Sequence, residues 1–196
     1  MKKTMLLQKY ENNGLCPKRL AYLEQVIQDD VNKGKYYGAQ IHITRGGEVG
    51  LNSAIGWAKE PGGKKLEKSD ILTLFSLSKG FTNVLGFKAI ENGQFSFTQK
   101  VSEVIPEFSG GLREQITFLD LFTHRIGIPT VFSPIPTMPL DVFDDMLKAI
   151  YELVHCTSQP GEEVSYAPML VHALIGEAVR RTDPKKRNFR DIAHEE

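Results

Sequence analysis

The chain has 196 residues, of which 41% are apolar and 24% charged, a length and composition that suit one substantial domain or two small ones. Its 24 basic and 24 acidic side chains give a formal net charge of zero, which favours neither nucleic acid nor an anionic membrane as partner. The two cysteines, Cys16 and Cys156, are far apart and predict reduced thiols in a cytoplasmic protein. The apolar run at the start is too short for a signal peptide, and no later run predicts a membrane span.

Up to residue 57 the pattern predicts one helix and one β-hairpin. Apolar residues recur at three- and four-residue steps over Pro17–Lys33, the proline suits a first helical turn, and Gly34 ends the run. Alternation over Gly38–Thr44 predicts a half-buried strand. A turn at residues 45–48 then leads into Val49–Trp57, which we predict to be the returning strand.

A polar loop, predicted over Trp57–Ser69, leads to a serine and a lysine three residues apart, Ser76 and Lys79. An apolar, strand-like run precedes the serine, and the apolar residues of Gly80–Glu91 have helical spacing. If Ser76 opens that helix, Lys79 lies one turn further on the same face, so that its amine reaches the serine hydroxyl. Gly86 lowers the helix propensity of this segment, which indicates close packing there.

The remainder of the chain is predicted to be mainly helical, with a long irregular loop over Pro129–Pro139. The predicted helices share an apolar face and cover Ile116–His124, Asp141–Val154 and Pro168–Arg181. The expected layout is a helix, a β-hairpin, the serine helix and then a helical region. This is a mixed α/β chain whose serine divides it into residues 1–75 and 76–196.

The residues alone leave two interpretations of the serine–lysine pair open. A serine hydroxyl becomes a good nucleophile when a neighbouring base takes its proton, and an uncharged Lys79 can be that base for Ser76. The alternative is a serine that caps a helix beside a solvated lysine, which is the more frequent explanation of four such residues.

Four stretches together resemble the serine β-lactamase-like superfamily, which includes class C β-lactamases, penicillin-binding peptidases, esterases and acyltransferases. Ser76–Lys79 matches its S-x-x-K motif, after a hairpin and at a helix start. Glu91–Phe108 is similar to a passage of the family that ends in Pro-Glu-Phe, and Ile116–Pro129 to its Leu-Leu-Thr-His helix and turn. Pro160–Tyr166 is similar to its second catalytic segment. The resemblance implies an antiparallel sheet flanked by helices plus a mainly helical region.

The resemblance also implies roles for three residues. Ser76 would be the acylated nucleophile, Lys79 its base, and Tyr166 a partner in proton transfer, acting on a small-molecule ester, amide or lactam without a cofactor or metal. The Ser76 backbone N–H would be one oxyanion-hole donor, since it lies at a helix N-terminus. The alternative for Tyr166 is a core tyrosine with a bonded hydroxyl.

Two departures from the family pattern bear on the substrate. The β-lactamases and peptidases have an asparagine two residues after the tyrosine, and its amide contacts the substrate, whereas here Pro168 cannot donate that hydrogen bond. Esterase and acyltransferase members tolerate this loss, so we expect esterase-type chemistry. His124 precedes Arg125 where the family has small hydroxyl residues, and we expect His124 to be a structural turn residue.

The family's third motif, a Lys or His and a small residue before Gly on a strand, is absent from the sequence. The resemblance therefore covers the N-terminal part of the fold, with the C-terminal sheet strands missing. A lone hairpin leaves open sheet edges, so we expect a second chain or a symmetry mate to complete the sheet. Two alternatives to the enzyme stay open: a catalytically inactive binding module or incomplete fragment that needs a partner chain, and an unrelated helical adaptor.

Overall fold

The computed structural model describes residues 14–130, 134–135 and 141–196. It is a mixed α/β chain with helices and a two-stranded antiparallel sheet, the fold class predicted from the sequence. Two compact units make up the chain: a first unit that ends at Thr73 and a second unit, Leu74–Glu196. The start of the chain and most of the predicted Pro-rich loop lie outside the described residues. Within those residues, no helix is long and apolar enough to cross a membrane.

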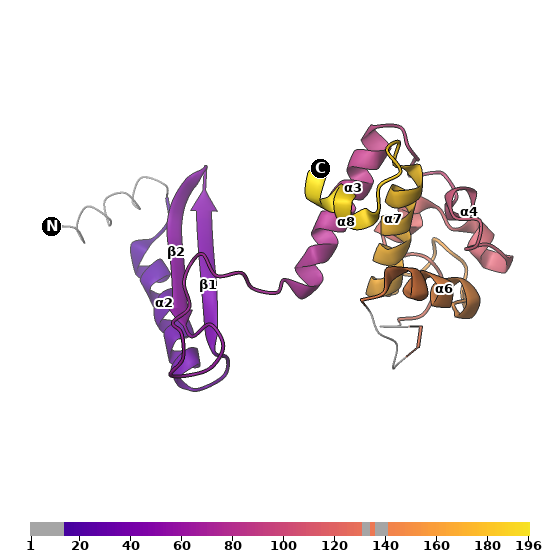
Figure 1. Ribbon diagram of the computed structural model, residues 1–196. Helices are drawn as coiled ribbons and strands as arrows, with labels where there is room; N and C mark the ends of the chain where they lie inside the picture. Colours follow the sequence, from indigo (N-terminus) through magenta and orange to yellow (C-terminus); the bar gives the residue numbers. More distant parts are fainter. Residues whose placement is uncertain (1–13, 131–133, 136–140) are drawn as a thin grey trace. The chain divides into compact units, whose positions relative to one another are not determined.

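The first unit is a helix packed on a β-hairpin (Figure 1). Helix α2 (Pro17–Asn32) has its proline in the first turn and packs against strand β2. Strands β1 (Gly38–Arg45) and β2 (Glu48–Gly56) pair antiparallel, with a register shift between Ile43 and Thr44. The predicted helix and hairpin are confirmed.

The core of the first unit is small. Its buried apolar side chains in the described part of the chain are Val31, Leu51 and Leu66. Neither strand has a second neighbour among the described residues, so each strand keeps an unpaired edge. A two-stranded sheet with so little buried surface is marginally stable by itself.

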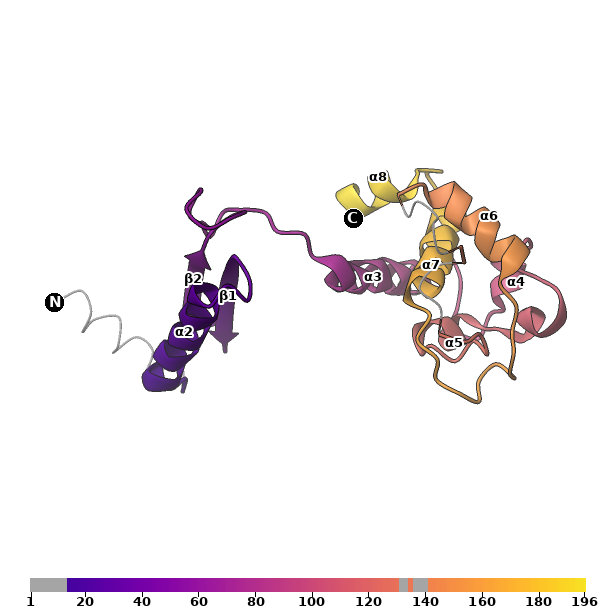
Figure 2. The ribbon, with the colours of Figure 1, turned by 90° about the horizontal axis from the view of Figure 1, so that it is seen from below.

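Helix α7 (Pro168–Thr182) is the centre of the second unit (Figure 2). Ten of its 15 residues are buried. Every other α-helix of the described part of this unit contacts α7, namely α3 (Ser78–Glu91), α4 (Val101–Val104), α5 (Phe118–Phe122), α6 (Phe143–Leu153) and α8 (Phe189–Glu195).

The approach to the serine differs from the prediction. Residues 71–74 form neither helix nor strand, and Ile71 is 98% exposed. Ser76 lies in a short 3₁₀ helix, η1 (Phe75–Leu77), and α3 begins at Ser78. The strand-like prediction was wrong because an apolar run becomes a strand only when another strand pairs with it, and neither β1 nor β2 does so.

Gly86 is a point of close packing between α3 and its neighbours α5 and α7. A Cβ at this position would lie 2.7 Å from Cζ of Phe122 and 3.0 Å from Cγ2 of Ile175 on α7. A larger residue at position 86 would therefore push α3 away from Phe122 of α5 and from Ile175 of α7. The close packing predicted from this glycine is confirmed.

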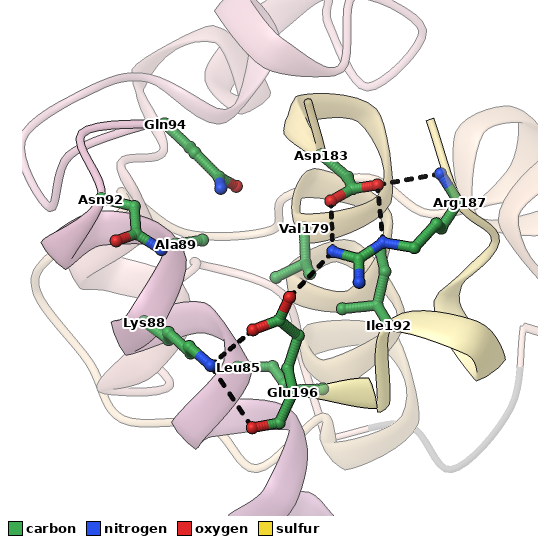
Figure 3. Close-up of a pocket in the computed structure, with 10 residues that line it drawn as sticks. All are labelled: Leu85, Lys88, Ala89, Asn92, Gln94, Val179, Asp183, Arg187, Ile192 and Glu196. Carbon is green, nitrogen blue, oxygen red and sulfur yellow. Dashed lines mark hydrogen bonds and ion pairs between the residues drawn. The ribbon is translucent and has the colours of Figure 1, made fainter. Parts of the chain in front are cut away.

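An ion-pair network holds α8 against α3 (Figure 3). Arg187 donates to the Asp183 carboxylate from its guanidinium (2.7 Å) and from its backbone N–H (2.8 Å), and it reaches the Glu196 carboxylate at 3.0 Å. Glu196 in turn pairs with Lys88 of α3. The hydrogen bonds from Arg187 lower the pKa of Asp183 to about 2. The pocket lined by these side chains has a volume of only about 40 Å³ and their charges are satisfied by one another, so the network is structural.

Replacing Gly86 by alanine tests the packing of α3 on α7. Alanine has the higher helix propensity, but the added methyl group cannot fit, so Gly86→Ala should destabilise the protein by about 1–3 kcal/mol. Gly80→Ala is the matched control in the same helix, because a Cβ there meets nothing within 4 Å. It should be neutral or stabilising by up to about 1 kcal/mol in urea unfolding. Equal effects of the two substitutions would contradict the packing.

The Asp183–Arg187 pair should make stability depend on pH. The folded-state pKa of Asp183, about 2, is below the ordinary aspartate value, so the stabilisation is complete above about pH 4 and is lost as pH falls towards 2. The difference in unfolding free energy between the wild type and Asp183→Asn should shrink over that range in denaturant titrations. In an Arg187→Met background the same comparison should give a flatter profile. A difference that stays constant from pH 5 to pH 2 would be inconsistent with the pair.

Candidate active site

Ser76 and Lys79 lie within hydrogen-bonding distance at the start of the serine helix. Lys79 Nζ donates to Ser76 Oγ at 2.8 Å, the proximity that the three-residue spacing led us to expect. Ser76 is exposed and Lys79 is half-buried. A serine hydroxyl and a lysine amine at this distance can exchange a proton directly.

The backbone just before Ser76 is in an unusual conformation. Phe75 has φ +47°, in the left-handed region that bulky residues rarely adopt. The Leu77 N–H donates to the Leu74 carbonyl at 3.1 Å and closes the turn that holds Phe75 and Ser76. The Ser76 N–H lies at the start of η1, where helix N–H groups lack intrahelical acceptors and can bind a developing negative charge.

Tyr166 is positioned by the pairing of two backbone segments, residues 161–165 and the turn that follows α5. Its loop is tied to the turn after α5 by hydrogen bonds from Ser165 N–H to the His124 carbonyl (2.9 Å) and from Gly161 N–H to the Arg125 carbonyl (2.7 Å). Gly127 is needed in this turn, since its φ is +66° and a Cβ would clash with the backbone of the opposite segment. The expected structural role of His124 is therefore met by its backbone, which itself has φ +56°.

The side chain of His124 also contributes to the site, because its ring lies next to two other aromatic rings there. Its centroid lies 5.0 Å from the ring of Tyr166 and 5.9 Å from the ring of His172 on α7. Burial, with the positive charge of Lys79 in second place, lowers the pKa of His124. Its Nδ1 is buried and has no hydrogen-bond partner among the described residues. The ring is thus a neutral wall between Tyr166 and His172.

Tyr166 contacts the ring of His124 and is not bonded directly to Ser76 or Lys79 among the described residues. Its side chain is 48% exposed, which rules out the alternative of a core tyrosine. Across the described residues its hydroxyl makes no hydrogen bond to Ser76 or Lys79, and the contact runs through His124 instead. The structure therefore brings Ser76 and Lys79 together directly, and it places Tyr166 against the ring of His124.

An open pocket of about 260 Å³ adjoins the serine–lysine pair. Lys79 lines it, and His172 enters it from α7. Most of its remaining surface is apolar and comes from α6, α7, α8 and the η1–α3 segment, including Phe75, Phe143 and Met169. The sequence prediction missed His172, although its position one turn after Pro168 on the same helix face is a signal that could have been used.

The described residues contain no group of three or more His, Cys, Asp or Glu side chains arranged to hold a metal ion. Cys16 and Cys156 are both free thiols. The chemistry available at this site is that of a hydroxyl, an amine, a phenol and two imidazoles.

Comparison with known proteins gives consistent results. The Beta-lactamase family model matches residues 23–196. Protein flp of Staphylococcus aureus (strain N315) is 29% identical over 154 residues, which are 75% of this chain and 30% of flp.

Two solved structures share the fold. A penicillin-binding protein homologue from Caulobacter crescentus has a TM-score of 0.75 at 24% identity, covering 93% of this chain and 48% of its own. A family VIII carboxylesterase has a TM-score of 0.73 at 19% identity, covering 90% of this chain and 47% of its own. The chain thus spans about a third of flp and about half of each structure. Because the family model matches most of its residues, the chain belongs to the beta-lactamase family.

Proposed function

We propose that this protein is a serine hydrolase or acyltransferase of esterase type that acts through an acyl-enzyme on Ser76. The observation that carries the proposal is the 2.8 Å separation of Lys79 Nζ and Ser76 Oγ beside an open pocket. Ser76 Oγ attacks the ester carbonyl carbon while uncharged Lys79 accepts the hydroxyl proton. The proton passes to the departing alkoxide as the ester C–O bond breaks, which leaves the acyl group on Ser76. Water or a second alcohol then displaces the acyl group as an acid or a new ester.

Two imidazole rings lie near enough to Lys79 for its charge to act on them. Burial lowers the pKa of both His124 and His172, which favours neutral rings beside the lysine. Tyr166, on the far side of His124, is placed to donate or relay a proton when substrate closes the remaining gap. We assign Tyr166 this role by resemblance and by its place in the cluster.

Two features favour an ester over a lactam. Pro168 opens α7 where the family's β-lactamases and peptidases present an amide, and a proline has no N–H to donate. The pocket beside Lys79 has mainly apolar walls, which suit an apolar acyl or alcohol group.

A catalytically inactive binding module is the second candidate. The observation that favours it is that the Tyr166 hydroxyl is not bonded to Ser76 or Lys79 among the described residues. Under this proposal the pocket binds a small molecule without acylating Ser76.

We also propose that a second polypeptide covers the apolar stripe on α3 and completes the sheet. The stripe consists of Leu77, Phe81 and Val84, at positions i, i+4 and i+7, which are 70%, 64% and 62% exposed. Three exposed apolar side chains in one row are typical of an interaction surface. Among the described residues, the unpaired edges of the β1–β2 hairpin are a second such surface.

A fluorophosphonate probe should label Ser76 covalently, because it reacts with activated serine hydroxyls. Intact-protein and peptide mass spectrometry should place the added mass on Ser76, and Ser76→Ala should abolish it. Lys79→Met should slow labelling by about 10²- to 10⁴-fold, the usual contribution of a general base. Ser78→Ala, two residues away, is the matched control and should label normally. Absence of labelling at every pH would favour the inactive alternative.

We predict that the apolar stripe on α3 mediates association of the chain with itself or with a second polypeptide. Sedimentation velocity should show association of the purified chain with itself or with a co-purifying polypeptide, and Phe81→Glu should weaken it strongly because a carboxylate would be buried without a partner. Leu153→Glu is the control, since Leu153 is also exposed, at 52%, but lies on α6 outside the stripe. A monodisperse monomer that melts in one cooperative transition would rule out the partner.

A further inference from the structure

His172 takes a position on α7 from which it can replace a missing polar contact. Pro168 stands where the β-lactamases and peptidases of the family present a substrate-binding amide, and it offers no donor. His172 is four residues further, hence on the same face of α7 and one turn deeper. It lines the pocket that also contains Lys79.

One hydrogen bond fixes the tautomer of His172. Nδ1 lies 2.8 Å from the Pro168 carbonyl oxygen. A carbonyl oxygen only accepts, so Nδ1 must carry the proton and donate it. In a neutral imidazole Nε2 then has the free lone pair, and among the described residues it has no hydrogen-bond partner. His172 therefore offers the pocket an acceptor, whereas an asparagine offers both a donor and an acceptor.

The neutral state of His172 has physical support. Burial is the largest influence that lowers its pKa, and the electrostatic interactions with His124 and Lys79 act in the same direction. The hydrogen bond to the Pro168 carbonyl raises the pKa. The titratable groups that act on the ring are Lys79 on α3 and His124 in the turn after α5.

The pocket links this acceptor to the nucleophile. Lys79 bonds to Ser76 on one side and lines the pocket with His172 on the other. An ester whose carbonyl carbon is at Ser76 Oγ would place its acyl side chain against the apolar walls formed by Phe143 and Met169. A donor near the acyl carbonyl would then face Nε2 of His172.

From this geometry we infer that His172 is a specificity-determining residue that selects esters whose acyl group combines an apolar body with an N–H or O–H donor. N-acylated apolar amino acid esters are the simplest members of this class. The inference rests on the proposed esterase function and adds the substrate class to it. A single half-exposed neutral hydrogen bond corresponds to a preference of about threefold to tenfold.

The test compares two p-nitrophenyl esters that differ by one hydrogen-bond donor: that of N-acetyl-phenylalanine and that of N-acetyl-N-methyl-phenylalanine. The wild-type chain should release p-nitrophenolate about threefold to tenfold faster from the N–H ester at low substrate concentration. His172→Phe keeps a ring but loses the acceptor, so its preference should fall to about one. His172→Gln restores an acceptor and should recover part of the preference. Equal preferences in the wild type and His172→Phe would overturn the inference.

Two further measurements separate this inference from the proposed function. Fluorophosphonate labelling of Ser76 reads the nucleophile alone, so normal labelling without donor preference would overturn only the role of His172. If neither labelling nor p-nitrophenolate release occurs, the proposed function fails and the inference with it. ¹⁵N NMR of histidine-labelled protein reads the tautomer without any substrate. Protonated Nδ1 and unprotonated Nε2 on His172 support the inference, and the opposite tautomer contradicts it.

Discussion

The close packing of α3 on α7 at Gly86 sets the geometry of the candidate site. The site residues lie near the N-terminal ends of these two helices: Ser76 and Lys79 on one side, Tyr166 and His172 on the other. Because Ile175 would contact any Cβ at position 86, the two helices approach as closely as a glycine permits. That approach lets the charge of Lys79 act on His172 and lets both residues line one pocket.

The sequence was informative where a local pattern has one physical meaning. The apolar period predicted α2, the alternation predicted the hairpin, and the helix-breaking Gly86 predicted tight packing, all before any tertiary contact was known. The S-x-x-K spacing fixed the proximity of Ser76 and Lys79 for the same reason, since one helical turn determines it.

The remaining features depend on contacts that a local pattern does not specify. The apolar run before Ser76 looks like a strand, but no neighbouring strand pairs with it, and the exposure of Ile71 follows. The place of His172 in the pocket depends on how α7 is packed, and its tautomer depends on the carbonyl of Pro168. His124 was predicted as a turn residue, which describes its backbone, but the place of its ring beside Tyr166 comes from the long-range pairing of two loops.

The residues of the candidate site all belong to the second unit, which has a buried core of its own around α7. Under the proposed function, the Ser76 N–H at the start of η1 would be one oxyanion donor. Loss of one oxyanion donor typically costs about 10²- to 10³-fold in turnover, while a highly reactive probe depends far less on that stabilisation. Covalent labelling would therefore test Ser76 as the proposed nucleophile even where turnover of an ordinary ester is slow.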